Sequence, residues 1–168
     1  LKEALLAMNE NPIVSGMTTN PSLMRKAGVQ NYTEFCLDVL KTIKTKPISF
    51  EVFADDFETM EKQARVIATW GENVYVKIPV QNSEGKSAMP LVRTLTQAGV
   101  KLNVTALYTV KQVQETCDAL KGGAPAYVSI FAGRAADLGH DPVPVVTEGA
   151  KICRQTGPQI ECLWESTR

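Results

Sequence analysis

One lysine lies in the middle of an apolar run, where its ammonium group cannot easily reach water. Lys77 is flanked by Val76 and Ile78 in the segment VYVKIPV. A lysine side chain in water has a pKa near 10.4, so about one in 2,500 is neutral at pH 7. Burial among apolar side chains favours the neutral amine, which can attack a carbonyl group. The segment therefore predicts a Schiff-base nucleophile. The alternative is a lysine that snorkels from a strand end or pairs with a carboxylate.

An acidic residue has a similar setting in an earlier segment. Glu51 lies between Phe50 and Val52 in SFEVFA. Imine formation requires a group that protonates the carbinolamine and exchanges protons through a water molecule, so Glu51 is a candidate acid/base. The other interpretation is an ion pair that keeps Lys77 charged. Both states can occur at different steps of one reaction.

Polar residues also end the remaining apolar segments. Asn103 and Thr105 are two residues apart and would share one face of a strand, where they could orient a water molecule or sugar hydroxyls. Arg134 follows the next segment, and Ser166 and Arg168 follow the last one. Arginine matches phosphate oxygens with paired hydrogen bonds, so these three residues are candidate phosphate ligands. A single arginine taken alone is more often a solvated surface charge.

The elements that must position these residues follow a regular pattern. Short apolar segments alternate with amphipathic ones, which is typical of parallel strands connected by helices. The expected strands cover residues 13–18, 47–54, 73–80, 100–107, 124–132 and 159–164. The expected helices cover residues 1–9, 32–43, 57–70, 86–98, 110–120 and 143–156.

Two architectures contain this alternation, an open doubly wound sheet and a closed (β/α)₈ barrel. The GxGxxG motif of a dinucleotide-binding sheet is missing from the sequence. In a barrel, the carboxyl ends of all strands meet at one mouth, where barrel active sites lie. The polar segment ends therefore predict an α/β fold, an incomplete TIM barrel with about strands 2 to 7. Residues 1–168 would form a single partial catalytic domain.

The composition favours a small-molecule substrate. Lysine plus arginine (18) balances aspartate plus glutamate (18), so the net charge of zero gives no long-range attraction to nucleic acid or an anionic membrane. No apolar run approaches the roughly 20 residues that span a bilayer. The four cysteines form no CxxC pair, and the single histidine, His140, has no metal-ligand spacing to them. We expect free thiols in a reducing cytoplasm, with no metal and no other cofactor.

Four segments together resemble the transaldolase family: TTNPS at 18–22, VYVKIPV around Lys77, NVTALYT at 103–109 and SIFAGR at 129–134. The likeness covers essentially the whole chain and is strongest to the short bacterial-type branch, which also contains fructose-6-phosphate aldolase. It implies a (β/α)₈ TIM barrel of the class I aldolase type. It also implies a cytoplasmic transferase of carbohydrate metabolism, in the non-oxidative pentose phosphate pathway. Such an enzyme passes a dihydroxyacetone unit from a ketose phosphate, such as sedoheptulose 7-phosphate or fructose 6-phosphate, to an aldose phosphate through a lysine Schiff base.

The resemblance also implies roles for single residues. Lys77 is implied as the Schiff-base lysine, Glu51 as the acid/base that acts through a water molecule, and Thr105 as a residue that helps to hold that water. The implied substrate contacts are Thr18, Asn20, Asn103, Ser129 and Phe131. The implied phosphate contacts are Arg134, Ser166 and Arg168.

Glu51 and Phe131 favour a transaldolase, because the aldolase branch tends to have glutamine and tyrosine at these positions. The alternatives are an aldolase that releases free dihydroxyacetone and a barrel remnant that binds sugar phosphates without turnover. The remnant is favoured by a departure: the family's strand-1 aspartate, which acts on the carbon–carbon bond, has no counterpart here, nor has strand 8 or the C-terminal helix.

A barrel without two of its strands exposes sheet edges and interior apolar surface. We therefore expect the full-length parent protein to be the enzyme, as a homo-oligomer whose partners are small-molecule sugar phosphates and neither nucleic acid nor membrane. The 168-residue piece alone is expected to be inactive.

Overall fold

The computed structural model describes residues 1–165 as an alternation of strands and helices. The strands are β1 (Met17–Thr18), β2 (Ile48–Glu51), β3 (Val74–Pro79), β4 (Leu102–Leu107), β5 (Ala126–Ile130) and β6 (Ile160–Trp164). The helices are α1 (Lys2–Glu10), α2 (Pro21–Lys26), α3 (Tyr32–Leu40), α4 (Phe57–Ala68), α5 (Met89–Gln97), α6 (Val110–Leu120), α7 (Ala132–Asp137) and α8 (Val143–Thr156). Each predicted strand and helix overlaps one of these elements.

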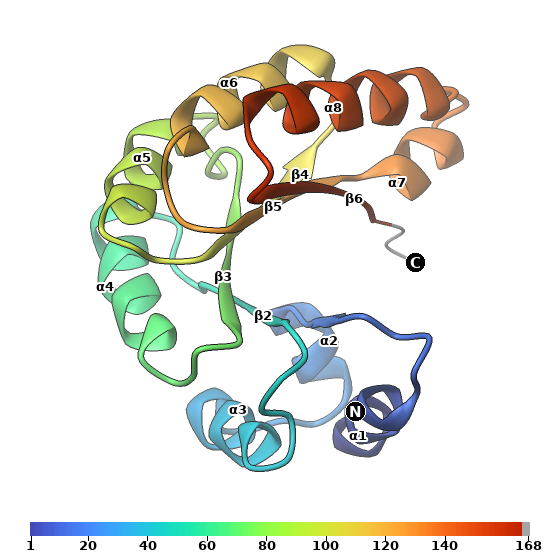
Figure 1. Ribbon diagram of the computed structural model, residues 1–168. Coiled ribbons are helices and arrows are strands. Elements are labelled where there is room, and N and C mark those ends of the chain that lie inside the picture. The colour runs from blue at the N-terminus through green and yellow to red at the C-terminus, as the bar shows by residue number, and fades with distance from the viewer. Residues whose placement is uncertain (166–168) are drawn as a thin grey trace.

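The six strands form one parallel sheet whose spatial order is the same as their order in the chain. The sheet curls, and helices such as α4, α5, α6 and α8 cover its convex side (Figure 1). A doubly wound sheet would reverse direction at a switch point, which this strand order does not do. The predicted fold class, an incomplete TIM barrel, is confirmed.

The two faces of the sheet carry different residue types. Phe50 and Val76 are fully buried on the helix-covered side. Because successive side chains in a strand point to opposite faces, the neighbouring positions point to the concave side. Glu51 pairs in register with Lys77, and Lys77 with Asn103, so these three polar residues share that concave face.

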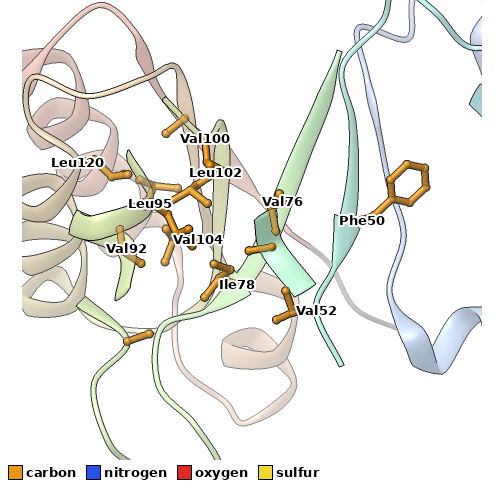
Figure 2. Packing of buried hydrophobic residues seen from close by; sticks show 14 of the residues in the cluster. Phe50, Val52, Val76, Ile78, Val92, Leu95, Val100, Leu102, Val104 and Leu120 are labelled. Carbon is orange, nitrogen blue, oxygen red and sulfur yellow. The ribbon is translucent and has the colours of Figure 1, made fainter. Parts of the chain in front are cut away.

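The helix-covered side is packed with aliphatic side chains. Figure 2 shows that strands and helices contribute to one cluster, in which fully buried members include Val76, Ile78, Leu102, Val104, Val92, Leu95 and Leu120. Removing this apolar surface from water stabilises the fold by about 25 cal/mol for each Å². The core therefore holds the strands from the outside and leaves the concave face free for polar groups.

Strand β4 contains one extra residue opposite β5. Val104 pairs with Val128 and Leu107 with Ile130, so the register shifts between these two pairs. Ala106 has a φ of 67°, in the left-handed region that side chains other than glycine rarely adopt. This β-bulge returns Leu107 to the buried outer side and leaves Thr105 on the concave face.

The prediction for the first strand was too long. Residues 13–18 were expected to form a strand, but β1 contains only Met17–Thr18. Ile13 is 87% exposed, so its apolar side chain does not contribute to the core.

Two short helices were not predicted. Helix α2 begins directly after Asn20, whose side chain accepts a hydrogen bond from the Leu23 amide at 2.8 Å, and Pro21 occupies the first helical position. Both residues are typical of a helix start. Helix α7 begins at Ala132, whereas the predicted strand extended to that residue. The strand ends earlier, at Ile130, and the run AGRAAD that follows contains good helix formers.

Candidate active site

The centre of the concave face is a buried ion pair. The Lys77 Nζ lies 2.6 Å from the Glu165 Oε1, and the two side chains are 3% and 16% exposed. The second carboxylate oxygen of Glu165 accepts a hydrogen bond from the Thr105 hydroxyl at 2.8 Å. The three residues come from β3, the end of β6 and β4. One carboxylate thus joins an amine and a hydroxyl across the curled sheet.

Glu165 is held in place by its backbone as well. Its amide donates to the Ile130 carbonyl at 2.9 Å, and its carbonyl accepts from the Gly133 amide at 3.3 Å. These bonds tie the residue to the end of β5 and the first turn of α7. The backbone hydrogen bonds of Glu165 to Ile130 and Gly133 therefore help to place its carboxylate beside Lys77.

Glu51 is the second carboxyl group near the amine. It lies at the end of β2, in register with Lys77 on β3. Burial raises the pKa of Glu51 from its ordinary value to about 7; the positive charge of Lys77 lowers this pKa and the negative charge of Glu165 raises it. At neutral pH the Glu51 carboxyl can therefore both give and accept a proton.

A second group of polar side chains lies deeper in the sheet. The Ser129 hydroxyl donates to the Asn103 Oδ1 at 2.7 Å, and the Asn103 amide donates to the Ser49 hydroxyl at 3.1 Å. All three residues are buried. The chain of hydrogen bonds connects β5, β4 and β2. It fixes the orientation of the Asn103 amide, with the oxygen toward Ser129 and the nitrogen toward Ser49.

Several of the predicted residues line one cleft of about 650 Å³ at the carboxyl ends of the strands. Glu51 and Phe131 line it, together with Asn20 and Arg134. The Asn20 oxygen is used as the cap of α2, while Arg134 is exposed on α7. The structure thus brings these four residues to one opening beside the Lys77 strand.

The other predicted residues are placed differently. Thr18 and Asn103 line a separate cavity of about 350 Å³ on the concave side, rather than the cleft. Thr105 contacts the Glu165 carboxylate. Ser166 and Arg168 lie outside the described residues. The roles assigned to all of these residues stay predictions.

Comparison with known proteins gives the family. The sequence model of the family described as Transaldolase/Fructose-6-phosphate aldolase matches residues 2–168. The chain belongs to the transaldolase/fructose-6-phosphate aldolase family.

Three relatives are each named as a probable transaldolase. A probable transaldolase of Streptococcus equi subsp. zooepidemicus is 39% identical over 166 residues, which cover 99% of this chain and 73% of the relative. A probable transaldolase of Dehalococcoides mccartyi is 35% identical over 93% of this chain and 68% of the relative. A probable transaldolase of Methanococcus maripaludis is 37% identical over 99% of this chain and 73% of the relative.

Sequence reasoning missed two features of this family member's site. Glu165 was not recognised. It stands two residues after Leu163, which lines the cavity on the concave side, so alternation along the strand places both on that side. Arg25 and Lys26 also line the cleft that contains Arg134. Their position depends on α2, which was not predicted.

Three further findings concern the described part of the chain. Residues 1–165 contain no group of three or more His, Cys, Asp or Glu side chains that could hold a metal ion. Within the same residues, no helix combines the length and apolar character needed to cross a membrane. All four cysteines are free thiols, and the Sγ atoms of Cys117 and Cys153 are 3.6 Å apart.

The raised pKa of Glu51 makes stability depend on pH. Between the ordinary value of 4.5 and about 7, the folded protein binds more protons at Glu51 than the unfolded chain does. Stability from this group is complete below about pH 4.5 and is lost as pH rises through about 7. Glutamine does not titrate, so Glu51→Gln does not lose this stability. Its free energy of unfolding, relative to that of the wild type, should therefore rise by on the order of 3 kcal/mol between pH 4.5 and about pH 7.

Urea unfolding at a series of pH values measures the difference. Glu58→Gln is the matched control, because Glu58 is 82% exposed on α4. A difference between Glu51→Gln and wild type that stays constant with pH would contradict the raised pKa.

Proposed function

We propose that the protein is a transaldolase that transfers a dihydroxyacetone unit from a ketose phosphate to an aldose phosphate through a Schiff base on Lys77. The observation that carries this proposal is the buried Lys77 amine beside a carboxylate on the polar face of a barrel of this family. The names of the relatives support the reaction class. In the full enzyme, this activity would serve cytoplasmic carbohydrate metabolism in the non-oxidative pentose phosphate pathway.

The chemistry begins when the neutral Lys77 amine attacks the ketose carbonyl. Glu51 exchanges protons with the carbonyl oxygen and the amine nitrogen as the carbinolamine forms, because its pKa of about 7 suits both directions of transfer. Loss of water gives the iminium ion. When the C3–C4 bond breaks, its electron pair moves to the iminium ion to give an enamine, the C4 hydroxyl passes its proton to the Glu51 carboxylate in the same cleft, and C4 leaves as an aldehyde. The Lys77 side chain is 3% exposed, which limits the access of bulk water to its nitrogen.

The cleft is suited to a phosphorylated substrate. Arg134, Arg25 and Lys26 line the opening that also contains Glu51. Arginine binds phosphate oxygens through paired, charge-assisted hydrogen bonds. The substrate would therefore place its carbonyl carbon at Lys77 and its phosphate at these cations, with Ser166 and Arg168 as further predicted ligands.

A fructose-6-phosphate aldolase is the second candidate, because the family description includes that activity. It would use the same imine but release free dihydroxyacetone. An assay of product formation with and without an acceptor aldose phosphate separates the two. We expect turnover to require the acceptor, whereas equal turnover in its absence would identify an aldolase.

Replacement of the amine tests the central residue. Lys77→Met should abolish the adduct that sodium borohydride traps with fructose 6-phosphate, because methionine has no nitrogen and roughly keeps the side-chain volume. Mass spectrometry of peptides from the full-length protein locates the adduct. Lys111→Met, at a position that is 86% exposed, serves as the control and should trap as the wild type does. An undiminished adduct in Lys77→Met would show that another lysine reacts.

Removal of Arg134 tests the phosphate end of the cleft. A charge-assisted hydrogen bond contributes about 1.5–3 kcal/mol, so Arg134→Ala should weaken the affinity for fructose 6-phosphate by roughly 10-fold to 100-fold. Trapping with dihydroxyacetone, which has no phosphate, should be unchanged. Arg154→Ala on the outer helix α8 is the control. Unaltered affinity in Arg134→Ala would exclude this residue as a phosphate ligand.

A further inference from the structure

Glu165 has no role in the reaction steps proposed for Lys77 and Glu51, yet its Oε1 makes a polar contact of 2.6 Å with the Lys77 Nζ. Its other oxygen is occupied by the Thr105 hydroxyl, so the carboxylate cannot rotate away without losing both contacts. The carboxylate is also well shielded from solvent, since the side chain is 16% exposed.

The surrounding structure fixes this contact from three directions. The bulge at Ala106 leaves Thr105 on the concave face at the end of β4. The Glu165 backbone is bonded to Ile130 and Gly133. Lys77 lies in the middle of β3, where both neighbouring strands pair with it in register. Such support from the surrounding residues is typical of a site that must hold its geometry during a reaction.

We propose that Glu165 is a catalytic proton carrier: it takes the proton from the Lys77 ammonium before attack and returns it to the departing hydroxyl of the carbinolamine. This inference rests on the Schiff-base function proposed for Lys77. In this proposal, Glu165 carries the proton that leaves the Lys77 ammonium. Glu51 moves a proton from the nitrogen to the former carbonyl oxygen while the carbinolamine forms.

The steps balance in atoms and charge. Ammonium and carboxylate become amine and carboxylic acid, and the amine adds to the ketone to give the carbinolamine. The carboxylic acid then protonates the hydroxyl, the C–O bond breaks, and water leaves. The products are the iminium ion, the Glu165 carboxylate and one water molecule. An amine cation and an iminium cation thus face the same carboxylate at the start and at the end.

This constant charge matters because the site is buried. A change of net charge in a poorly solvated site is energetically costly. With Glu165 as proton carrier, every state of the Lys77–Glu165 pair from the ammonium to the iminium ion has a net charge of zero. Glu51 is less suited to the first step, because burial raises its pKa to about 7 and so keeps part of it protonated at neutral pH.

A passive ion pair gives the opposite prediction. If Glu165 only stabilised the Lys77 ammonium, its neutralisation in Glu165→Gln would leave a buried ammonium without a counter-ion and would favour the neutral amine. Adduct formation would then be as fast as in the wild type or faster. If Glu165 carries the proton, the same variant must be slower.

The test measures how fast the full-length protein forms an adduct with dihydroxyacetone in the presence of cyanoborohydride, across a range of pH. This ketone needs no carbon–carbon cleavage and no phosphate site, so the assay isolates imine formation. Glu165→Gln should lower the rate at neutral pH by about 100-fold or more, in line with the loss of a general acid–base group. Glu165→Asp, which keeps the carboxylate, should recover part of the rate.

Glu165→Ala provides a readout that a structural role would not produce. Added formate should restore adduct formation in this variant, with a rate that rises with formate concentration, whereas formamide should not. Glu148→Gln, an exposed acid on α8, is the control for a general charge effect. Circular dichroism and thermal unfolding of each variant identify those that fold. If Glu165→Gln and Glu165→Ala do not fold, the rate of Glu165→Asp still tests the role of the carboxylate.

The outcomes separate the two proposals. If the wild type forms an adduct on Lys77 and Glu165→Gln reacts as fast or faster, the role of Glu165 is wrong and the Schiff base stands. If formate fails to rescue a folded Glu165→Ala, the proton-carrier role is likewise wrong. If the wild type forms no adduct on Lys77, the proposed function itself fails.

Discussion

The buried contact between an ammonium group and a carboxylate is the interaction on which the rest of this site depends. Removing a single charge from water costs several kcal/mol, and only a partner with good geometry offsets that cost. Lys77 has such a partner in Glu165, which is 88 residues away in the sequence and follows β6, three positions from β3 in the sheet. The sheet curls (Figure 1), and the Lys77–Glu165 contact joins β3 to the end of β6 across its concave face.

The two faces of the sheet have different roles: one packs the core and the other carries the polar residues of the site. The outer side chains form a closely packed aliphatic core with the helices, which gives the strands their position without using any group of the site. The concave face can then hold polar residues in a network, as in the bonds from Ser129 through Asn103 to Ser49. The bulge at Ala106 adjusts this division at one point, where Thr105 meets Glu165.

Much of the fold could be predicted from periodicity, whereas one contact of the site could not. The apolar surroundings of Lys77 indicated its burial, and the side chain is 3% exposed. The fold class followed from the alternation of strands and helices. Glu165 was missed because its partners lie on strands distant in the sequence, and the curl of a sheet is a property of packing rather than of any local pattern. Helices α2 and α7 were missed because six residues give too little periodicity to detect, although the Asn20–Pro21 pair is a helix-start signal.

A crystal structure of the full-length protein soaked with dihydroxyacetone would show the Schiff base itself. We predict continuous density between the Lys77 nitrogen and a substrate carbon, with the Glu165 carboxylate still within hydrogen-bond distance of that nitrogen. An unmodified Lys77 still paired with Glu165, with the ketone bound covalently at another lysine, would contradict it.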